Sequence, residues 1–284
     1  MRAAAMDDAH RLGHPDAQAL ETNVETAMPE HATEAGAESG GVAAVDRALS
    51  ILGAFRLDDG ALTLAELAAR TGIYKSTILR LSQSLIRARL LLRLDDGQYR
   101  IGPEALRLGT LYQRTHHMAD VVLPVMRDLM EETGESVVLH VREGGARVVL
   151  HRVESRHAIR YHVSEGDTLP LSAGSGGRVL AAFSGSSGEP FEQIRERFHH
   201  ASFGERVPDT SGMAAPIFGP RQALAGALTI AGPSVRIDAA FVTRHLPALL
   251  EAAALITNKL GGNAAAFMAA LEAARAQAAA SGRA

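Results

Sequence analysis

The stretch that decides the fold of this chain, residues 63–101, reads TLAELAARTGIYKSTILRLSQSLIRARLLLRLDDGQYRI. Its first helix has a clear start, because Thr63 can cap it and Glu66 can return a hydrogen bond to the cap amide. Gly72 is placed to end this helix in a left-handed conformation. The next helix starts only a few residues later, near Lys75. Two helices joined by so short a turn cross steeply, as in a helix-turn-helix.

The second helix of this stretch, predicted from Lys75, has two different faces. Apolar residues recur at helical spacing at Ile78, Leu81 and Leu85, so this face is expected to be buried. The opposite face holds no acid and is rich in donors: Lys75, Ser76, Thr77, Arg80, Gln83, Ser84 and Arg87. Phosphates attract such a face, and Arg, Gln, Ser and Thr can read base edges. A merely solvated helix face is the alternative interpretation.

The residues after this helix favour DNA binding. Two short strand-like runs, 90–94 and 98–101, flank an Asp-Asp-Gly sequence, which is a hairpin signal. Between Arg70 and Arg100 there are seven basic and two acidic residues, a net charge of +5, whereas the whole chain carries −3. Positive charge is therefore concentrated around the helix that would contact DNA.

Five segments follow from these patterns along the chain. They are a disordered acidic extension (1–41), a winged helix-turn-helix domain (42–103), a linker helix (104–117), a second domain (118–261) and an Ala-rich tail (262–284). The extension has eight acids, two arginines and no apolar periodicity, which is typical of disorder. The tail repeats apolar residues at near-helical spacing, which predicts a marginal helix that needs a packing partner.

Helices and hairpin strands are both expected in the second domain. The expected strands are 136–142, 147–153, 160–163, 213–218 and 223–231, and the expected helices are 118–133, 177–183, 189–200 and 239–260. Antiparallel hairpins with helices gathered outside them are typical of an α+β sensor-like domain.

A loop of small residues, LPLSAGSGG at 169–177, leads directly into one of these helices. Small residues leave backbone N–H groups accessible at a helix N-terminus, where the helix dipole also favours an anion. We therefore expect this loop to hold a carboxylate ligand. A glycine loop that serves chain geometry only is the alternative.

The composition excludes several classes of protein. The chain has 284 residues, enough for two domains, and 46% hydrophobic content is typical of a globular protein. It contains no cysteine, which excludes disulfides, thiolate metal sites and a cysteine nucleophile. No apolar run approaches the roughly 20 residues that span a bilayer, and the N-terminus lacks a signal-peptide core. We expect a cytoplasmic protein that binds no membrane, and no motif predicts a cofactor.

Several motifs occur in a fixed order along the chain: VDRALSIL at 45–52, LAELA at 64–68, TG at 71–72, KST at 75–77, RL at 80–81, GQYRIG at 97–102, EGDTLPL at 165–171, AAP at 214–216 and GP at 232–233. Together they resemble the IclR family of bacterial transcription regulators, over residues 42–261. The resemblance implies a winged helix-turn-helix joined by a linker helix to a GAF-like effector-binding domain, in an α+β fold. It also implies dimers, often paired into tetramers, that bind palindromic double-stranded operator DNA.

The resemblance also assigns candidate sites. In the family, the helix that begins at Lys75 enters the major groove, which implies DNA contacts from four matching residues: Lys75, Ser76, Thr77 and Arg80. Gln83 is added on the face argument alone. The implied effector pocket comprises the backbone of Ser175 and Gly176, together with Gly212, Thr229 and Ala231.

Two pocket positions depart from the family's frequent pattern. Gly212 stands where cysteine is common, and Ala231 where serine is common. Both exchanges are expected to enlarge the pocket and remove polar partners. We therefore expect an organic acid bulkier or less polar than glyoxylate or pyruvate, for example an aromatic acid.

Three other functions were weighed from the residues. Ser175 lies in a small-x-Ser-x-Gly sequence that approximates the nucleophile elbow of a hydrolase, but an elbow follows a buried parallel strand and here a Pro-containing loop precedes it. His140, His151, His157 and His162 could bind a metal, but their spacing does not match helical i, i+4 pairs. A winged helix can also serve only as a protein-interaction module. We expect no enzyme activity and no metal.

Overall fold

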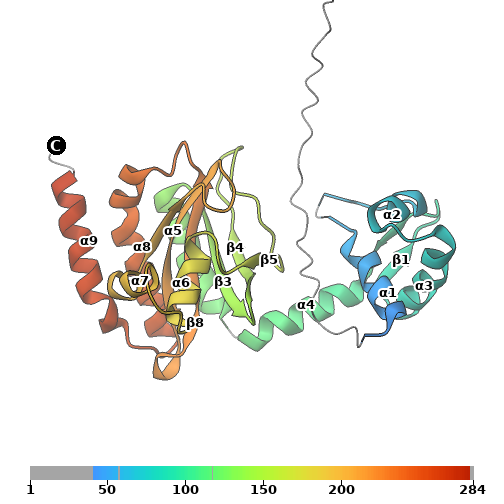
Figure 1. The fold of residues 1–284 in the computed structure, drawn as a ribbon, viewed down its shortest axis with the longest axis horizontal. Helices are drawn as coiled ribbons and strands as arrows, with labels where there is room; N and C mark the ends of the chain where they lie inside the picture. The colour runs from blue at the N-terminus through green and yellow to red at the C-terminus, as the bar shows by residue number, and fades with distance from the viewer. Residues whose placement is uncertain (1–40, 57, 117, 282–284) are drawn as a thin grey trace, which may run out of the picture. The chain divides into compact units, whose positions relative to one another are not determined.

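A computed structural model of the chain describes residues 41–56, 58–116 and 118–281. The acidic extension predicted at 1–41 lies outside these residues, except for its last residue. The N-terminal part contains three helices and a two-stranded antiparallel hairpin (Figure 1). They are α1 (Ala43–Gly53), α2 (Leu64–Thr71), α3 (Lys75–Arg87), β1 (Leu91–Arg93) and β2 (Tyr99–Ile101). The predicted winged helix-turn-helix is therefore confirmed.

The boundaries of α2 follow from the residues that cap it. The Thr63 amide donates to Glu66 Oε2 at 2.8 Å, and the Glu66 amide donates to Thr63 Oγ1 at 3.2 Å. Gly72 adopts φ 68° and donates its N–H to the Ala68 carbonyl at 3.0 Å, which ends the helix. The capping box and the left-handed glycine were both predicted, and both are confirmed.

A small core holds these elements together. Ile51, Leu67 and Ile78 are fully buried, one from each helix. Tyr99 on β2 is also buried and exchanges two backbone hydrogen bonds with Leu62, the residue before the α2 cap. The hairpin is thus anchored beside the start of α2.

Two helices lead from the hairpin into a six-stranded antiparallel sheet. They are α4 (Pro103–His116) and α5 (Ala119–Thr133), which ends at Gly134 with φ 74°. The sheet has the order β5-β4-β3-β8-β7-β6. Its strands are β3 (Ser136–Glu143), β4 (Ala146–Val153), β5 (Thr168–Pro170), β6 (His200–Phe203), β7 (Thr210–Phe218) and β8 (Leu224–Pro233).

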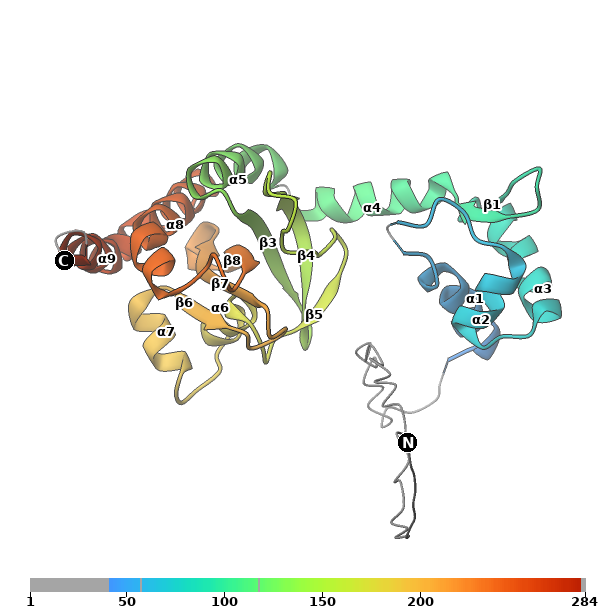
Figure 2. The same ribbon diagram turned by 90° about the horizontal axis from the view of Figure 1, so that it is seen from above.

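Helices cover both faces of this sheet. Figure 2 shows α5 and α8 (Ala239–Lys259) on one face and α6 (Ser175–Phe183) and α7 (Phe191–Arg197) on the other. The main core lies under α5 and α8, where alternate strand residues such as Leu139, Met213 and Leu228 are fully buried. The intervening residues therefore face α6, and this alternation positions the site described below.

Helix α8 is 21 residues long and, by length and composition alone, could cross a membrane. Leu249, Leu250 and Ile256 on this helix are fully buried and belong to the main core. These three residues pack α8 against the sheet. The helix was predicted at 239–260, but an apolar helix long enough to span a membrane was not expected.

The chain after α8 adds a further helix. Two short 3-10 turns, η1 (Pro220–Gln222) and η2 (Ala264–Phe267), lie before β8 and before α9 (Met268–Ser281). Phe267 is fully buried and its ring lies 5.0 Å from that of Phe198 and 6.2 Å from that of Phe218. Leu271 and Ala274 on α9 are buried as well, and α9 packs against α8, so the predicted tail helix has its packing partner.

Two sequence predictions were wrong in this domain. Residues 160–163 do not form a strand; they lie in a loop, where the Tyr161 carbonyl accepts a hydrogen bond from Arg152 instead of pairing in the sheet. The edge strand is β5 instead. The helix predicted at 189–200 ends at Arg197, because Phe198 adopts φ 57° and the chain turns into β6.

Candidate functional site

One surface of α3 carries the residues predicted to contact DNA. They are Lys75, Ser76, Thr77, Arg80 and Gln83, of which only Thr77 is half-buried and the others are exposed. Ile78 and Leu85 bury the opposite side of the helix. The donor-rich face is therefore held outward by a fixed core contact, as the periodicity predicted. That these five side chains bind DNA stays a prediction.

Not every basic residue near α3 is available to a ligand. The guanidinium of Arg70 binds both carboxylate oxygens of Asp59, with Nη2 to Oδ1 at 3.0 Å, and Nη1 also donates to the Ala54 carbonyl. The hydrogen bond from Arg70 holds the pKa of Asp59 below its ordinary value. Arg70 thus joins α2 to the segment after α1, and part of the local charge excess is structural.

Sequence reasoning missed an aromatic residue beside this face. Tyr74 occupies the N-cap position of α3, makes no side-chain capping bond and is 84% exposed. The sequence contained an indication of this residue, because Ser, Thr, Asp or Asn is usual at an N-cap and a tyrosine there is not. The exposed ring adds an apolar contact surface next to Lys75 and Ser76.

The second candidate site lies between α6 and the sheet. Side chains alternate along a strand, so Gly212 on β7 and Thr229 and Ala231 on β8 share the face that α6 covers. Ser175 and Gly176 form the first turn of α6. All five residues predicted for the effector site line one cavity. That they bind an effector stays a prediction.

Two glycines let α6 and the strands approach closely. A Cβ at Gly176 would lie 2.8 Å from Thr229 Oγ1 and 2.9 Å from His140 Nδ1. A Cβ at Gly212 would lie 2.7 Å from the Ile230 carbonyl oxygen. The position that a side chain at Gly212 would take is thus already crowded by backbone. Gly212 adds no free volume here, contrary to the expectation from the sequence.

Sequence reasoning also missed the charged residues of this cavity. Arg147 lines it and is only 2% exposed; its Nη1 donates to the Ala173 carbonyl at 3.0 Å. Burial lowers the pKa of Arg147 to about 10, so the side chain is still protonated at neutral pH. Arg206 lines the cavity as well. An arginine at the first position of a predicted strand is usually exposed, so no local pattern indicated that Arg147 is buried.

A buried histidine forms the floor of the cavity. His140 on β3 is 1% exposed, and its Nδ1 lies 3.1 Å from Thr229 Oγ1 on β8. Burial, and then the charges of Arg147 and Arg206, hold its pKa well below the ordinary value, so the ring is neutral. Its Nε2 has no hydrogen-bond partner among the described residues. A neutral ring with a free nitrogen can bind a ligand hydroxyl or carboxylate group.

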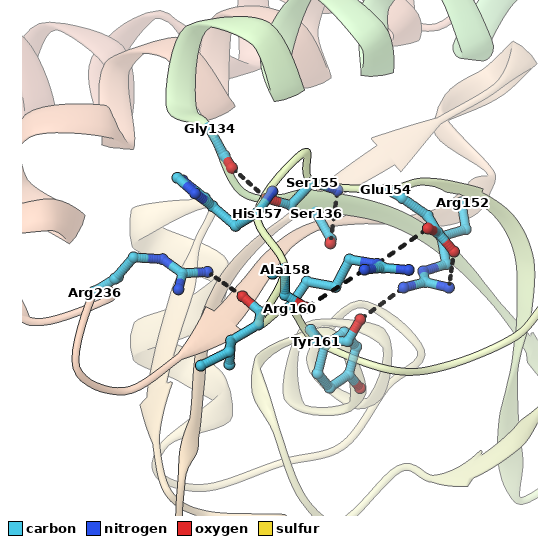
Figure 3. A network of polar contacts seen from close by, with 11 residues as sticks. Gly134, Ser136, Arg152, Glu154, Ser155, His157, Ala158, Arg160, Tyr161 and Arg236 are labelled. Atoms are coloured by element: carbon cyan, nitrogen blue, oxygen red, sulfur yellow. Dashed lines mark hydrogen bonds and ion pairs between the residues drawn. The ribbon is translucent and has the colours of Figure 1, made fainter.

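The loop that contributes Tyr161 to the cavity is held by a polar network (Figure 3). Arg152 donates to Glu154 at 2.7 Å and to the Tyr161 carbonyl at 2.7 Å. Ser155 Oγ donates to the Gly134 carbonyl, and Arg236 donates to the Ile159 carbonyl. Tyr161 is therefore positioned by backbone contacts, although it lies outside any strand.

The metal and hydrolase alternatives involve His140, His151, His157, His162 and Ser175. Among the described parts of the chain, no three His, Cys, Asp or Glu side chains are grouped so that they could hold a metal ion. Ser175 follows a short antiparallel edge strand and a loop, and its amide donates to Ser202 Oγ at 2.9 Å. A nucleophile elbow instead requires a strand of a parallel sheet.

Two family models and several curated proteins match this chain. The family model "IclR helix-turn-helix domain" matches residues 44–95, and "Bacterial transcriptional regulator IclR C-terminal" matches residues 110–189. The HTH-type transcriptional regulator BhcR of Paracoccus denitrificans is 31% identical over 243 residues, which are 76% of this chain and 86% of that protein. The chain belongs to the IclR family. Another IclR-family relative is the Transcriptional repressor IclR of Escherichia coli, which is 25% identical, with 79% and 92% covered.

Solved structures of the IclR family share the fold. The Thermotoga maritima IclR aligns with a TM-score of 0.63 at 21% identity, covering 76% of this chain and 98% of that one. An IclR homologue from Microbacterium hydrocarbonoxydans, crystallised with 4-hydroxybenzoate, aligns with a TM-score of 0.64 at 22% identity and the same coverage.

Family membership distinguishes a DNA-binding regulator from a hydrolase and from a module that binds only proteins. This IclR-family chain is a transcription regulator with an N-terminal helix-turn-helix DNA-binding domain and a C-terminal IclR effector domain. Its named relatives are regulators and not enzymes, which overturns the hydrolase alternative. A winged helix used only for protein interaction is excluded on the same ground.

Proposed function

We propose that this regulator binds operator DNA through α3 and that a small organic acid, held between α6 and the sheet, modulates the binding. The proposed DNA contacts are Lys75, Ser76, Thr77 and Arg80, with Gln83 on the same face. The proposed effector contacts are Ser175, Gly176, Gly212, Thr229 and Ala231. The regulator acts in the cytoplasm, where its operator is.

The exposed donor face of α3 supports the DNA part of the proposal. Lys75 and Ser76 stand at the first turn, where a helix that enters the major groove commonly contacts the duplex. Arg80 lies one turn further on and can bind a guanine edge through two hydrogen bonds. The exposed Arg93 and Arg100 on the hairpin can add phosphate contacts.

Exposed apolar surface supports assembly as a homodimer or homotetramer. On α1, Val45 and Leu49 are 53% and 57% exposed. On α4, Leu106 is 75% exposed, and Leu108 and Leu111 are also exposed. Apolar patches of this kind mark interaction surfaces. A second copy of the chain would cover them and would place two α3 helices on the two halves of a palindromic operator.

The buried cation in the cavity is the observation that carries the effector part. Arg147 is protonated and buried, so an acid is the ligand that offsets its charge. A relative with the same fold was crystallised with 4-hydroxybenzoate, which is a carboxylic acid. The lining arginines and His140 favour a polar acid, so the "less polar" part of the sequence hypothesis is not retained.

A contact between the linker helix and the effector domain supports coupling of the two functions. Gln113 on α4 donates to Glu165 Oε2 at 2.9 Å, and the Arg152 amide donates to Glu165 Oε1 at 3.1 Å. An effector that favours one arrangement of the linker would change the spacing of the two α3 helices. Such coupling requires that the two arrangements differ in affinity for the ligand.

The test is a genome-wide map of sites bound by the tagged full chain, followed by titration of the bound fragments at several salt concentrations. Specific complexes that weaken steeply as ionic strength rises are expected, because binding releases counterions. Failure to bind any genomic fragment above the level of random DNA, at low salt, would overturn the proposal.

A further inference from the structure

The cavity between α6 and the sheet carries two positive charges without a neutralising acid. Of the thirteen described residues that line it, two are arginines, Arg147 and Arg206, and none is Asp or Glu. The N-terminus of the nine-residue helix α6 also lines it; here Glu205 accepts from the Gly174 amide and Ser202 from the Ser175 amide, so the two arginines are the main source of positive charge. The electrostatics of the site therefore favour more than one negative charge.

Arg147 forms no ion pair with any described acid, and the charge of Glu205 acts on it only without direct contact. Its side chain is anchored by one neutral contact, from Nη1 to the Ala173 carbonyl, and its Nε has no partner among the described residues. Glycines at 174 and 177 leave room for the guanidinium, since a Cβ at Gly177 would clash with Nη1. The fold thus keeps an unpaired guanidinium inside the domain, and removing a charge from water without a partner is costly.

Arg206 is positioned by contacts that leave its charge unneutralised. Its Nη2 donates to Tyr161 Oη at 3.1 Å, and its guanidinium carbon lies 5.4 Å from the centre of the Tyr161 ring. The neighbouring Glu205 is engaged elsewhere: it accepts hydrogen bonds from Arg178 and from the Gly174 amide at 2.9 Å. A second anionic group in the cavity would give Arg206 a partner.

The size of the cavity limits the ligand. The volume open to the centre of a water-sized sphere is about 30 Å³. One water needs roughly 10–15 Å³ by this measure, so the cavity as it stands holds two or three waters. His140 Nε2, buried and unpartnered, gives the floor a further polar group. A short, polar molecule fits this space better than a long or apolar one.

We infer that the effector is a short-chain dicarboxylate, with one carboxylate on Arg147 near the α6 N-terminus and the other on Arg206. This inference rests on the proposed function, because it names the acid that the same cavity would bind. Arg147 binds either a mono- or a dicarboxylate, whereas Arg206 distinguishes between them.

The test compares acids of equal carbon number by isothermal titration calorimetry on the full chain: malonate against propionate, and succinate against butyrate, with inorganic phosphate as a separate arm. A second charge-assisted contact predicts at least about tenfold tighter binding of each dicarboxylate. Arg206→Gln should bring dicarboxylate affinity to that of the monocarboxylate. Arg147→Gln should abolish binding of both, and Arg147→Lys, which keeps the charge, should retain part of it.

The control is Arg156→Gln, since Arg156 is 80% exposed, pairs with Glu131 and does not line the cavity. It should bind all acids as the unaltered chain does. Equal or tighter binding of monocarboxylates, tighter binding of phosphate, or no binding of either acid series would overturn the inference. Binding of genomic fragments by the same samples distinguishes a failure of the dicarboxylate inference from a failure of the proposed function. If those complexes form while the dicarboxylate preference is absent, only the inference fails; if they are absent, the proposed function fails.

Discussion

Gly176 on α6 packs directly against the hydrogen-bonded pair of His140 and Thr229, which joins β3 to β8 through Nδ1 and Oγ1 at 3.1 Å. The contact is so close that only a residue without a Cβ fits over the pair. The same contact sets the distance between α6 and the sheet, and hence the depth of the cavity.

Gly176→Ala should therefore destabilise the effector domain and close the cavity. The added methyl must displace His140, Thr229 or α6, and overpacking of this kind costs about 1–3 kcal/mol in the free energy of unfolding. Urea unfolding of the full chain measures this cost. Gly145→Ala is the matched control, because a Cβ there meets nothing within 4 Å. Equal stability of the two variants would contradict the packing described here.

Arg80→Ala should weaken operator binding by about 1–3 kcal/mol, which is roughly fivefold to 150-fold. The side chain is exposed on the donor-rich face of α3 and takes no part in the core, so folding should be unchanged. Fluorescence anisotropy with a labelled operator fragment at constant salt measures the effect. Arg127→Ala, which removes an exposed charge on α5, is the control and should bind normally. An operator complex of unchanged affinity would show that α3 is not the reading helix.

Thr63→Ala should destabilise the DNA-binding domain by about 1 kcal/mol, since it removes the side-chain half of the α2 capping box. Thermal unfolding followed by circular dichroism measures the change. Thr63→Ser keeps the accepting oxygen and should retain most of the stability. If serine and alanine destabilise equally, the loss comes from the methyl group and not from the cap.

The free energy of unfolding should fall as the pH falls below about 6.5, in part because of His140. Burial, and then Arg147 and Arg206, hold the pKa of its folded-state ring well below the ordinary 6.5. The unfolded chain therefore binds a proton that the folded chain excludes, and this contributes up to about 1.4 kcal/mol per pH unit. His140→Asn should reduce the slope of stability against pH between 7.5 and 5.5, measured by urea unfolding. An unchanged slope would show that the ring is protonated in the folded chain.

The parts of the fold set by local interactions were predictable from the sequence. Thr63, Glu66 and Gly72 define α2 through contacts within a few residues, so their pattern is sufficient to place the helix. Two strand-like runs on either side of Gly144 and Gly145 also predicted β3 and β4 to within one residue at each end.

The failures arose where a distant contact decides the backbone. Tyr161 and Val163 are buried alternately as in a strand, but the Tyr161 carbonyl binds Arg152 and the segment stays a loop. Likewise, His200 begins β6 because β7 offers it a partner at Ala214, which no local pattern could indicate.

Only part of the effector cavity was predictable, because some of its residues are brought together by contacts between distant parts of the chain. The loop 169–177 was singled out because small residues before a helix are visible in the sequence, and the resemblance to the IclR family then named Ser175 and Gly176 within it. Arg147 was not, because its burial depends on the space left by Gly174 and Gly177, some thirty residues away along the chain. In the sequence, an arginine that becomes buried cannot be distinguished from one that stays exposed.

The loop between β4 and β5 holds Tyr161 at the cavity and, four residues later, Glu165 at the linker helix. A ligand that displaces the Tyr161 ring would therefore act on the same loop that accepts the hydrogen bond of Gln113. Residues 161 and 163 belong to a cluster separate from the main core under α5 and α8, so such a ligand would meet the loop before it meets that core.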